Sequence, residues 1–244
     1  MTDEGFFSRT ALVYGDGARD VLGESRVIVF GVGGVGGYVC EALARTGVGH
    51  IELVDSDTVN ESNLNRQIVA LRSNIGRKKT EIMRERILDI NPSAQVVAHD
   101  CFFLGEEGQF DFPHYDYVAD CIDTVSAKVA LIKLAQKAGT PVISAMGCAG
   151  KTDPSRLKIT DIYKTNTDPL AKNMRLLLRR AGIKKCRVVF SDEVPVTREK
   201  RSTETAAGGE KRVRVIGSSI FVPASAGLMI GASIVKELLK KKDE

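Results

Sequence analysis

The stretch that decides the fold is RVIVFGVGGVGGYVCEALART, residues 26–46. The apolar run 27–30 predicts a buried β-strand, and the segment 38–46 is typical of a helix. The turn between them contains Gly31, Gly33, Gly34 and Gly36. Glycine permits a tight turn and lets the backbone come close to phosphate, while the N-terminus of the following helix offers free N–H groups. This stretch therefore predicts a strand–turn–helix unit that binds an anion such as the phosphate chain of a nucleotide.

An acidic side chain follows the next predicted strand. Residues 51–54 form a second apolar run, and Asp55 comes directly after it, where a dinucleotide-binding fold holds the ribose hydroxyls. Asp57 is a second candidate for this role. The alternative is a glycine-rich turn in a purely structural α/β unit, but the strand, the helix and the acid are all in place. We therefore expect a nucleotide site.

A polar cluster, NLNRQ at residues 63–67, lies beyond the acid. An ordinary dinucleotide enzyme does not require an arginine-bearing cluster here, so we interpret the nucleotide as a reactant. Arg66 alone, or Lys79 alone, would be more typical of a surface charge. Only the joint pattern argues for a reactive site.

Length and composition indicate a compact domain of ordinary size. The 244 residues carry a formal net charge of +4 and can bury one substantial core, so we expect a single domain over 1–244. No apolar run reaches about 18 residues, and we expect a cytoplasmic protein that neither enters a membrane nor is secreted. The five cysteines include no C-x-x-C pair, which argues against a disulfide framework and a zinc site.

Apolar segments alternate with helical ones through the first 150 residues. We expect strands at 51–54, 95–98, 117–121 and 142–144, and helices at 78–90 and 126–138. This alternation is typical of an α/β fold with a doubly wound, mostly parallel Rossmann-like sheet covered on both faces. Because ligands bind at the carboxyl ends of such strands, the glycine turn, Asp55 and Asp123 should meet in one crevice.

The pattern changes after residue 151. Isolated strands are expected at 157–162, 188–190 and 213–216, with one basic helix and a final helix of small residues at 224–239. We interpret them as a partly antiparallel, distal half of the same sheet. Residues 197–211 are almost devoid of apolar side chains, so we expect a mobile loop, either a lid ordered by substrate or a solvated hairpin connection.

Several motifs together resemble those of a known superfamily. They are Gly31-x-Gly33-Gly34-x-Gly36, Asp55-x-Asp57, Asn63-x-Asn65-Arg66-Gln67, Gly76 with Lys79, and Asp120-Cys121-Ile122-Asp123. Over at least residues 26–150 the chain is similar to the adenylating superfamily of ubiquitin-activating enzymes and the bacterial ThiF and MoeB proteins. Residues 147–193 most resemble the tRNA threonylcarbamoyladenosine dehydratases of that superfamily. The shared segments there are Thr152-Asp153-Pro154, Thr160-Asp161, Asp168-Pro169-Leu170 and Phe190-Ser191.

The resemblance implies an ATP site with Mg²⁺. The residues implied to bind the nucleotide are Gly31, Gly33, Gly34, Gly36, Asp55, Asp57, Asn63, Asn65, Arg66, Gln67, Lys79 and Asp123. Asp123 would also bind the metal ion through a carboxylate oxygen. Arg66, Lys79 and Asp123 would serve catalysis, together with Arg9, which related dimers lend to the neighbouring subunit's ATP. For Asp57 a local capping role is the alternative.

The implied reaction is activation of a carboxylate. The carboxylate attacks the α-phosphorus of ATP and pyrophosphate leaves, which requires alignment and positive charge but no protein nucleophile. In the dehydratase interpretation, the threonyl carboxylate of threonylcarbamoyladenosine in tRNA is activated, and ring closure then releases AMP. The alternative is activation of a small sulfur-carrier protein, although many such enzymes carry paired C-x-x-C ligands that are missing here. An NAD-dependent dehydrogenase or a nucleotide sensor would leave Asn65, Arg66, Lys79 and Asp123 unexplained.

The expected partners are tRNA and a second copy of the chain, and a cysteine desulfurase system is left open. Residues 172–187 contain seven basic side chains and no acid. We expect Lys172, Arg175, Arg179 and Arg180 to contact RNA phosphates, because Met174, Leu177, Leu178 and Ala181 would form the packed face of the same helix. An ordinary solvated face is the alternative. The resemblance implies a homodimer, which the small residues at 224–233 favour.

Two cysteines have open roles. Cys186 lies between Lys185 and Arg187, and cationic neighbours favour a reactive thiolate, but we interpret it as a packing or incidental thiol. Cys148 is expected near the crevice, where a small buried residue is its alternative role.

Overall fold

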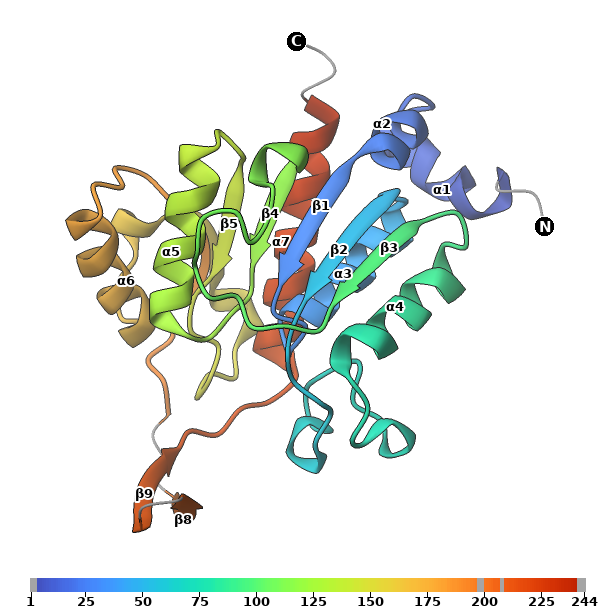
Figure 1. Ribbon diagram of the computed structural model, residues 1–244. Coiled ribbons are helices and arrows are strands. Elements are labelled where there is room, and N and C mark those ends of the chain that lie inside the picture. Colours follow the sequence, from blue (N-terminus) through green and yellow to red (C-terminus); the bar gives the residue numbers. More distant parts are fainter. Residues whose placement is uncertain (1–3, 197–199, 207–208, 241–244) are drawn as a thin grey trace.

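A seven-stranded sheet forms the centre of the molecule (Figure 1). The computed structural model describes residues 4–196, 200–206 and 209–240. The strands are β1 (Arg26–Phe30), β2 (His50–Val54), β3 (Gln95–His99), β4 (Tyr117–Asp120), β5 (Val142–Ala145), β6 (Leu157–Asp161) and β7 (Arg187–Ser191). Their order is β3-β2-β1-β4-β5-β7-β6, and every neighbouring pair is parallel except β7 with β6. The predicted doubly wound, mostly parallel sheet with an antiparallel distal part is confirmed.

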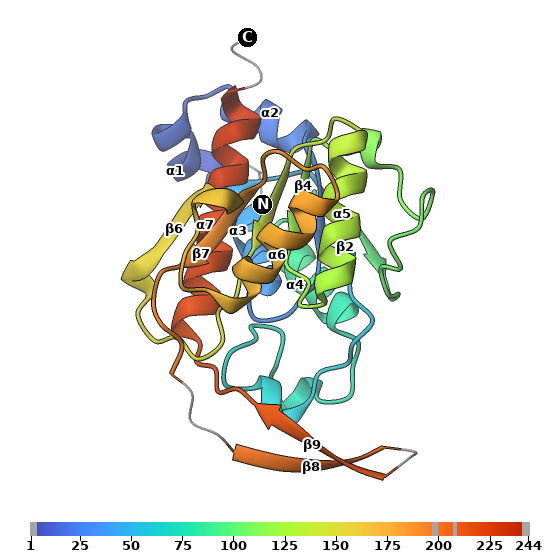
Figure 2. The same cartoon turned by 90° about the vertical axis from the view of Figure 1, so that its left-hand side faces the viewer.

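Helices cover both faces of the sheet (Figures 1 and 2). The helices α3 (Gly36–Thr46), α4 (Lys79–Ile90) and α7 (Phe221–Lys240) lie on one face, and α5 (Val125–Lys137) and α6 (Pro169–Arg180) lie on the other. Two further helices, α1 (Glu4–Tyr14) and α2 (Ala18–Glu24), precede β1. Short 3-10 turns are η1 (Glu61–Asn63), η2 (Arg72–Asn74), η3 (Phe112–His114), η4 (Pro154–Arg156) and η5 (Ile162–Lys164).

Strand β1 contributes to two cores. Val27 and Val29 are buried with residues of α3 and α7, whereas Ile28 and Phe30 are buried with residues of α5 and α6. A strand covered on both faces reads as a continuous apolar run, which is why the sequence revealed it. The direction of strand order reverses between β1 and β4, and this reversal opens a crevice at the carboxyl ends of the two strands.

Helix α7 packs on α3 through two glycines. A Cβ atom at Gly227 would lie 2.4 Å from the carbonyl oxygen of Val35, and one at Gly231 would lie 2.6 Å from Cβ of Ala42. Among the residues that the structure describes, α7 is the one helix long and apolar enough to cross a membrane, but 56% of its apolar window is buried inside the protein. The small residues at 224–233 thus contact the same chain, and the homodimer stays a prediction.

The structure corrects one expectation for the distal half. Residues 213–216 were expected in the main sheet, but β9 (Gly209–Val215) pairs with β8 (Lys200–Ala206) in a separate antiparallel ribbon (Figure 2). Much of the expected loop at 197–211 is therefore paired backbone, while 197–199 and 207–208 lie outside the described residues. The sequence did not indicate this pairing, because β8 has no apolar alternation and that of β9 is limited to Val213 and Val215. The mobility of the segment stays a prediction.

Candidate functional site

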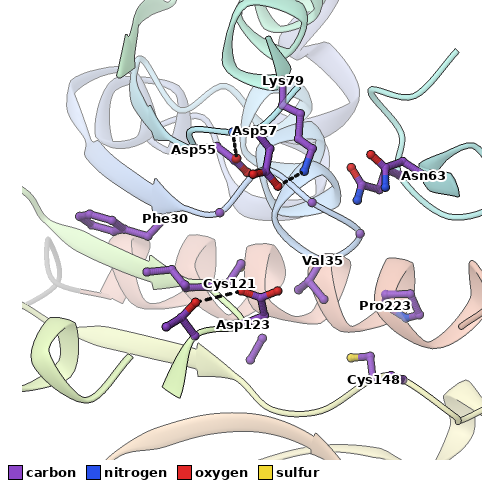
Figure 3. A pocket seen from close by; sticks show the side chains of 18 of the residues that line it. Phe30, Val35, Asp55, Asp57, Asn63, Lys79, Cys121, Asp123, Cys148 and Pro223 are labelled. Atoms are coloured by element: carbon purple, nitrogen blue, oxygen red, sulfur yellow. Dashed lines mark hydrogen bonds and ion pairs between the residues drawn. The ribbon is translucent and has the colours of Figure 1, made fainter. Parts of the chain in front are cut away.

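A cavity of about 1070 Å³ opens at the carboxyl end of the sheet, where the strand order reverses (Figure 3). It is lined by most of the residues that the sequence predicted: Gly31, Gly33, Gly34, Asp55, Asp57, Asn63, Asn65, Arg66, Gln67, Lys79 and Asp123. Other walls come from residues 101–104, 147–149 and 216–218, which the sequence did not single out as a group. The expected convergence on one crevice is confirmed.

The glycine turn depends on two close backbone approaches. Gly31 has a φ of +87°, and a Cβ atom on it would lie 2.7 Å from the carbonyl oxygen of Cys121. At Gly36, which does not line the cavity, a Cβ atom would lie 1.7 Å from the carbonyl oxygen of Gly31. Gly36 therefore lets α3 begin directly against the turn, so that the helix N-terminus faces the cavity.

Asp55 links the end of β2 to the glycine turn. Its Oδ2 accepts a 2.7 Å hydrogen bond from the Val32 N–H, and its Oδ1 accepts a 2.8 Å bond from the Asp57 N–H. Burial raises the pKa of Asp55 above the ordinary aspartate value, while nearby Lys79 acts in the opposite direction. Each carboxylate oxygen retains a second lone-pair direction, so Asp55 can also accept a ligand hydroxyl.

Lys79 is a buried cation paired with Asp57 (Figure 3). Its Nζ lies 2.7 Å from Asp57 Oδ2, and its side chain is only 5% exposed, against 60% for that of Asp57. Lys79 is thus no ordinary surface charge. The side chain of Asp57 contacts this ammonium and does not cap α4, whose N-cap residue is Lys78 and has no side-chain capping hydrogen bond.

Asn65 and Arg66 form a chain of contacts at the cavity wall. Arg66 Nη1 donates to Asn65 Oδ1 at 2.9 Å and to the carbonyl oxygen of Ser62 at 2.7 Å. Asn65 Nδ2 donates in turn to the carbonyl oxygen of Ser218, also at 2.9 Å. Asn65 therefore connects Arg66 to the segment that precedes α7. The two bonded residues are 153 positions apart in sequence, so no local motif predicts this contact.

Asn63 and Gln67 are both buried but differ in their partners. Asn63 Oδ1 accepts a hydrogen bond from the Asn60 N–H at 3.1 Å and so closes the capping box of η1. Gln67 is 8% exposed, and its Oε1 has no hydrogen-bond partner among the described residues. Because a buried polar atom without a partner is unfavourable, a water molecule or a ligand that reached this amide oxygen would stabilise the site.

Asp123 is exposed at the cavity, on a loop held from behind by buried charges. Lys128 Nζ lies 3.0 Å from Asp120 Oδ2 and donates to the carbonyl oxygen of Ile122 at 3.0 Å, and the side chains of this pair are fully buried. The hydroxyl of Ser144 donates to the same Asp120 oxygen at 2.5 Å. Sequence reasoning missed Lys128, although its position on the apolar face of α5 with Leu131, Ile132 and Ala135 was a signal.

A bound metal would depend on the nucleotide. Across residues 4–196, 200–206 and 209–240, no group of three or more His, Cys, Asp or Glu side chains could hold an ion. Asp123 offers one hard carboxylate ligand. That set fits Mg²⁺ bound mainly through phosphate oxygens and water, and it does not fit a resident all-protein metal centre.

Helix α6 lies beside the cavity, which its residue Leu170 lines. Lys172, Arg179 and Arg180 are exposed, and the guanidinium of Arg179 lies 5.3 Å from the centre of the Tyr163 ring. Arg175 is half-buried and donates to the carbonyl oxygen of Thr165 at 3.0 Å. One nitrogen of Arg175, Nη1, is therefore already bonded within the protein, whereas the other three side chains are exposed. None of the four lines the cavity, and neither does Arg9.

For Cys186 the structure favours the packing thiol over the reactive thiolate. Its side chain is buried, and burial raises its pKa to about 12, so the thiol stays protonated despite the neighbouring cations. Lys184, Lys185 and Arg187 are exposed, so these side chains lie in water and not in the buried surroundings of the thiol. Cys148 lines the cavity as expected, and burial raises its pKa to about 11.

The fold and the cavity define an adenylating-enzyme architecture: the chain belongs to the ThiF family, which it matches over residues 7–244. It is 46% identical over 241 residues to the tRNA threonylcarbamoyladenosine dehydratase of Bacillus subtilis, covering 96% of this chain and 94% of the relative. Crystal structures of Escherichia coli TcdA, a tRNA N6-threonylcarbamoyladenosine dehydratase, in complex with AMP and with ATP are similar at TM-scores of 0.87 and 0.85. They are 35% and 34% identical, and each match covers 98% of this chain and 96% of the other. The predicted family is confirmed.

Proposed function

We propose that this protein is an ATP-dependent tRNA threonylcarbamoyladenosine dehydratase, with one adenylating domain over residues 1–244. The observation that carries the proposal is the single cavity in which the glycine turn, the buried Lys79 and Asp123 meet. The similarity to dehydratases over nearly the whole chain supports the choice of substrate. It favours this function over activation of a sulfur-carrier protein, for which the cavity provides no specific support.

ATP binds with its phosphates along Gly31, Gly33 and Gly34 and with its ribose at Asp55, while Gly36 lets α3 begin directly behind this turn. The N–H groups at the start of α3 face the phosphates, and Arg66 and Lys79 add positive charge beside them. Asn63, Asn65, Asp57 and Gln67 complete the nucleotide site; Asn65 orients Arg66, and Asp57 orients Lys79. Asp123 holds Mg²⁺, which neutralises charge on the phosphates.

The site then activates the threonyl carboxylate of the modified nucleoside. A carboxylate oxygen attacks the α-phosphorus, the bond to the bridging oxygen breaks, and pyrophosphate leaves. A nitrogen of the same modification next attacks the acyl carbon, and AMP departs with the former carboxylate oxygen, so that the net change in the nucleoside is loss of water. Arg66 and Lys79 stabilise the charge that develops on the phosphates. The Cys148 thiol, whose pKa is about 11, stays protonated at neutral pH, in keeping with a mechanism without a protein nucleophile.

The tRNA lies across the exposed basic residues of α6, Lys172, Arg179 and Arg180. Arg175 supports the helix through Thr165 and contributes charge without a free guanidinium. The protein acts in the cytoplasm as a homodimer in which Arg9 serves the nucleotide of the neighbouring subunit. A cysteine desulfurase system is a further candidate partner.

The test uses tRNA isolated under mild conditions from cells that lack this protein. The purified protein is incubated with this tRNA and Mg-ATP, and the digested nucleosides are weighed by mass spectrometry. We expect threonylcarbamoyladenosine to lose one water with matching release of AMP. Asp123→Ala should abolish both products, whereas Asp192→Asn, at an exposed ion pair outside the cavity, should retain them. Unchanged tRNA, with pyrophosphate exchange dependent on a sulfur-carrier protein, would favour the alternative function.

A further inference from the structure

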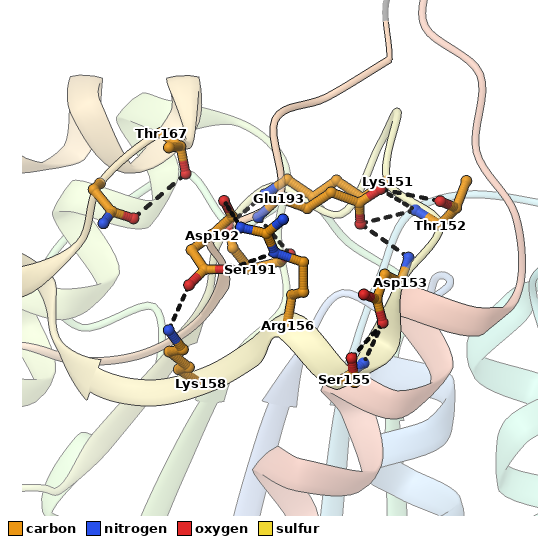
Figure 4. Close-up of polar contacts among 11 residues, drawn as sticks. Lys151, Thr152, Asp153, Ser155, Arg156, Lys158, Thr167, Ser191, Asp192 and Glu193 are labelled. Carbon is orange, nitrogen blue, oxygen red and sulfur yellow. Dashed lines mark hydrogen bonds and ion pairs between the residues drawn. The ribbon is translucent and has the colours of Figure 1, made fainter.

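A fully buried ion pair lies behind residues 147–149, which line the cavity and form its floor. Lys151 and Asp168 have no exposed side-chain surface, and neither lines the cavity. Lys151 Nζ donates to Asp168 Oδ2 at 2.5 Å, to the carbonyl oxygen of Gly147 at 2.7 Å and to that of Ser191 at 3.0 Å. Figure 4 shows Lys151 beside Ser191 among the polar contacts of the distal half. All three hydrogens of the ammonium are therefore used, and they join three separate segments.

The pair links the cavity floor to α6. Gly147 belongs to the floor, and a Cβ atom on it would lie 2.9 Å from Asp168 Oδ2, so the floor and the start of the helix meet without a side chain between them. Asp168 Oδ1 caps α6 by accepting the Ala171 N–H at 2.7 Å. One carboxylate thus fixes the first turn of α6, whose residue Leu170 lines the cavity, and holds the ammonium under the floor.

Stability alone does not account for this arrangement. Thr167, directly before the cap, has a φ of +49°, a left-handed conformation that costs a non-glycine residue free energy. Buried ion pairs are costly to desolvate, and apolar residues of similar volume often stabilise a fold equally well or better. The strained backbone at Thr167 and the Lys151–Asp168 pair together hold the start of α6 in one position. This cost indicates that the position of α6 relative to the cavity matters for function.

We propose that Lys151 is a positioning residue that acts through Asp168 to set α6 relative to the cavity floor. A carboxylate on an RNA bound to Lys172, Arg179 and Arg180 is thereby brought to the nucleotide. This inference rests on the proposed function. The 12 residues of α6 span about 18 Å, so a small tilt at its first turn displaces its far end. Reacting atoms must approach to about 3–3.5 Å, and a misplacement of about 1 Å can lower the rate about 100-fold.

The decisive variant is Lys151→Met combined with Asp168→Asn. The two changes remove both charges together, because loss of one partner would leave the other charge buried and unpaired. We expect kcat for modified tRNA, expressed per ATP-binding site, to fall at least tenfold. The Kd values for ATP and for tRNA should change less than about threefold, since both sets of contact residues remain. Calorimetric stoichiometry counts the ATP sites, so unfolded protein does not enter kcat.

Two further variants complete the test. Asp192→Asn removes the ion pairs to Arg156 and Lys158 one residue beyond Ser191 and should leave kcat unchanged (Figure 4). If the double variant does not fold, Gly147→Ala replaces it, because this change places a methyl group against Asp168 Oδ2. It should lower kcat and leave the Kd values for ATP and tRNA nearly unchanged. A normal kcat per site in these variants would overturn the inference, whatever the loss of folded protein. A wild-type protein inactive on modified tRNA would instead overturn the proposed function, and this inference with it.

Discussion

The nucleotide half of the molecule, residues 26–128, and the distal half, residues 147–193, reach the same cavity by different means. In the nucleotide half, short motifs supply the groups that line the cavity, as in the glycine turn and Asp55-x-Asp57. In the distal half, the polar contacts join residues far apart in sequence, such as Lys151 with Asp168 and Thr152 with Glu193. Groups that line the cavity are thus visible in sequence, whereas the contacts that orient them are not.

Each half nevertheless contains a fully buried lysine–aspartate pair behind the cavity. Lys128 and Asp120 hold the carbonyl oxygen of Ile122, next to Asp123, while Lys151 and Asp168 hold that of Gly147, next to Cys148. A buried ammonium orients carbonyl groups strongly because water does not compete for it. The two halves therefore share one device for fixing a loop at the cavity.

Gly36→Ala should have the largest effect, and it tests whether the local glycine motif builds the nucleotide half. Its Cβ atom would lie 1.7 Å from the carbonyl oxygen of Gly31, so the turn and α3 could not keep their positions. We expect ATP binding to be lost and the free energy of unfolding to fall by about 3 kcal/mol or more. Calorimetry and urea unfolding measure the two quantities. Gly23→Ala, where a Cβ atom contacts nothing within 4 Å, is the control and should not lower stability. Normal ATP binding by Gly36→Ala would show that the close contact between Gly36 and the carbonyl oxygen of Gly31 is not needed for the nucleotide site.

Lys79→Met should have the next largest effect. Removing the buried cation beside the phosphates should lower the rate of AMP formation about 100-fold at saturating tRNA. A quench-flow or discontinuous assay of AMP measures it. Lys78→Met is the matched control, because its ammonium pairs with Asp100 at the surface and should change the rate less than about twofold. Equal rates of AMP formation in the two variants would show that the buried ammonium of Lys79 does not contribute to catalysis.

A smaller and different effect is expected in the distal half. Combined replacement of Lys172, Arg179 and Arg180 by glutamine should weaken tRNA binding about tenfold at low salt. It should also reduce the slope of log Kd against log salt by about two to three, because fewer counterions are released. Filter binding at several salt concentrations measures both quantities. The same charge change at Arg45, Arg84 and Lys236, on helices of the opposite face, should leave the slope unchanged. An unchanged slope for the α6 variant would remove this helix from the RNA surface.

The smallest effect is expected for Cys186→Ser. Because burial keeps this thiol protonated, with a pKa of about 12, we expect turnover within about twofold of the wild type. Iodoacetamide at pH 8 should modify Cys186 slowly in the folded protein and readily after unfolding, as mass spectrometry of peptides can show. Rapid modification with loss of activity would instead show that the Cys186 thiol is reactive and required for turnover.

The prediction of the strands succeeded where both faces of a strand are buried. The expected strands 27–30 and 142–144 are β1 and β5, each with one residue more. The expected strand 95–98 is β3, also with one residue more, although this edge strand is only partly buried. The prediction failed for 213–216, because β9 pairs with β8 and not with the apolar core. Arg175 shows the same limit in a side chain: the helical pattern correctly made α6 amphipathic, but not even a clear pattern reveals that one of its arginines contacts Thr165.

By itself, the sequence determined the family, the parallel sheet and the groups around the cavity. These follow from local patterns: apolar periodicity, glycines that permit a turn, and acids and bases at strand ends. Only the tertiary structure decided that Cys186 is a buried thiol, that Lys79 is buried against Asp57, and that Lys128 and Lys151 lie behind residues that line the cavity. The physical reason is that burial and long-range pairing set the charge and orientation of a side chain, and neither is encoded in its nearest neighbours along the chain.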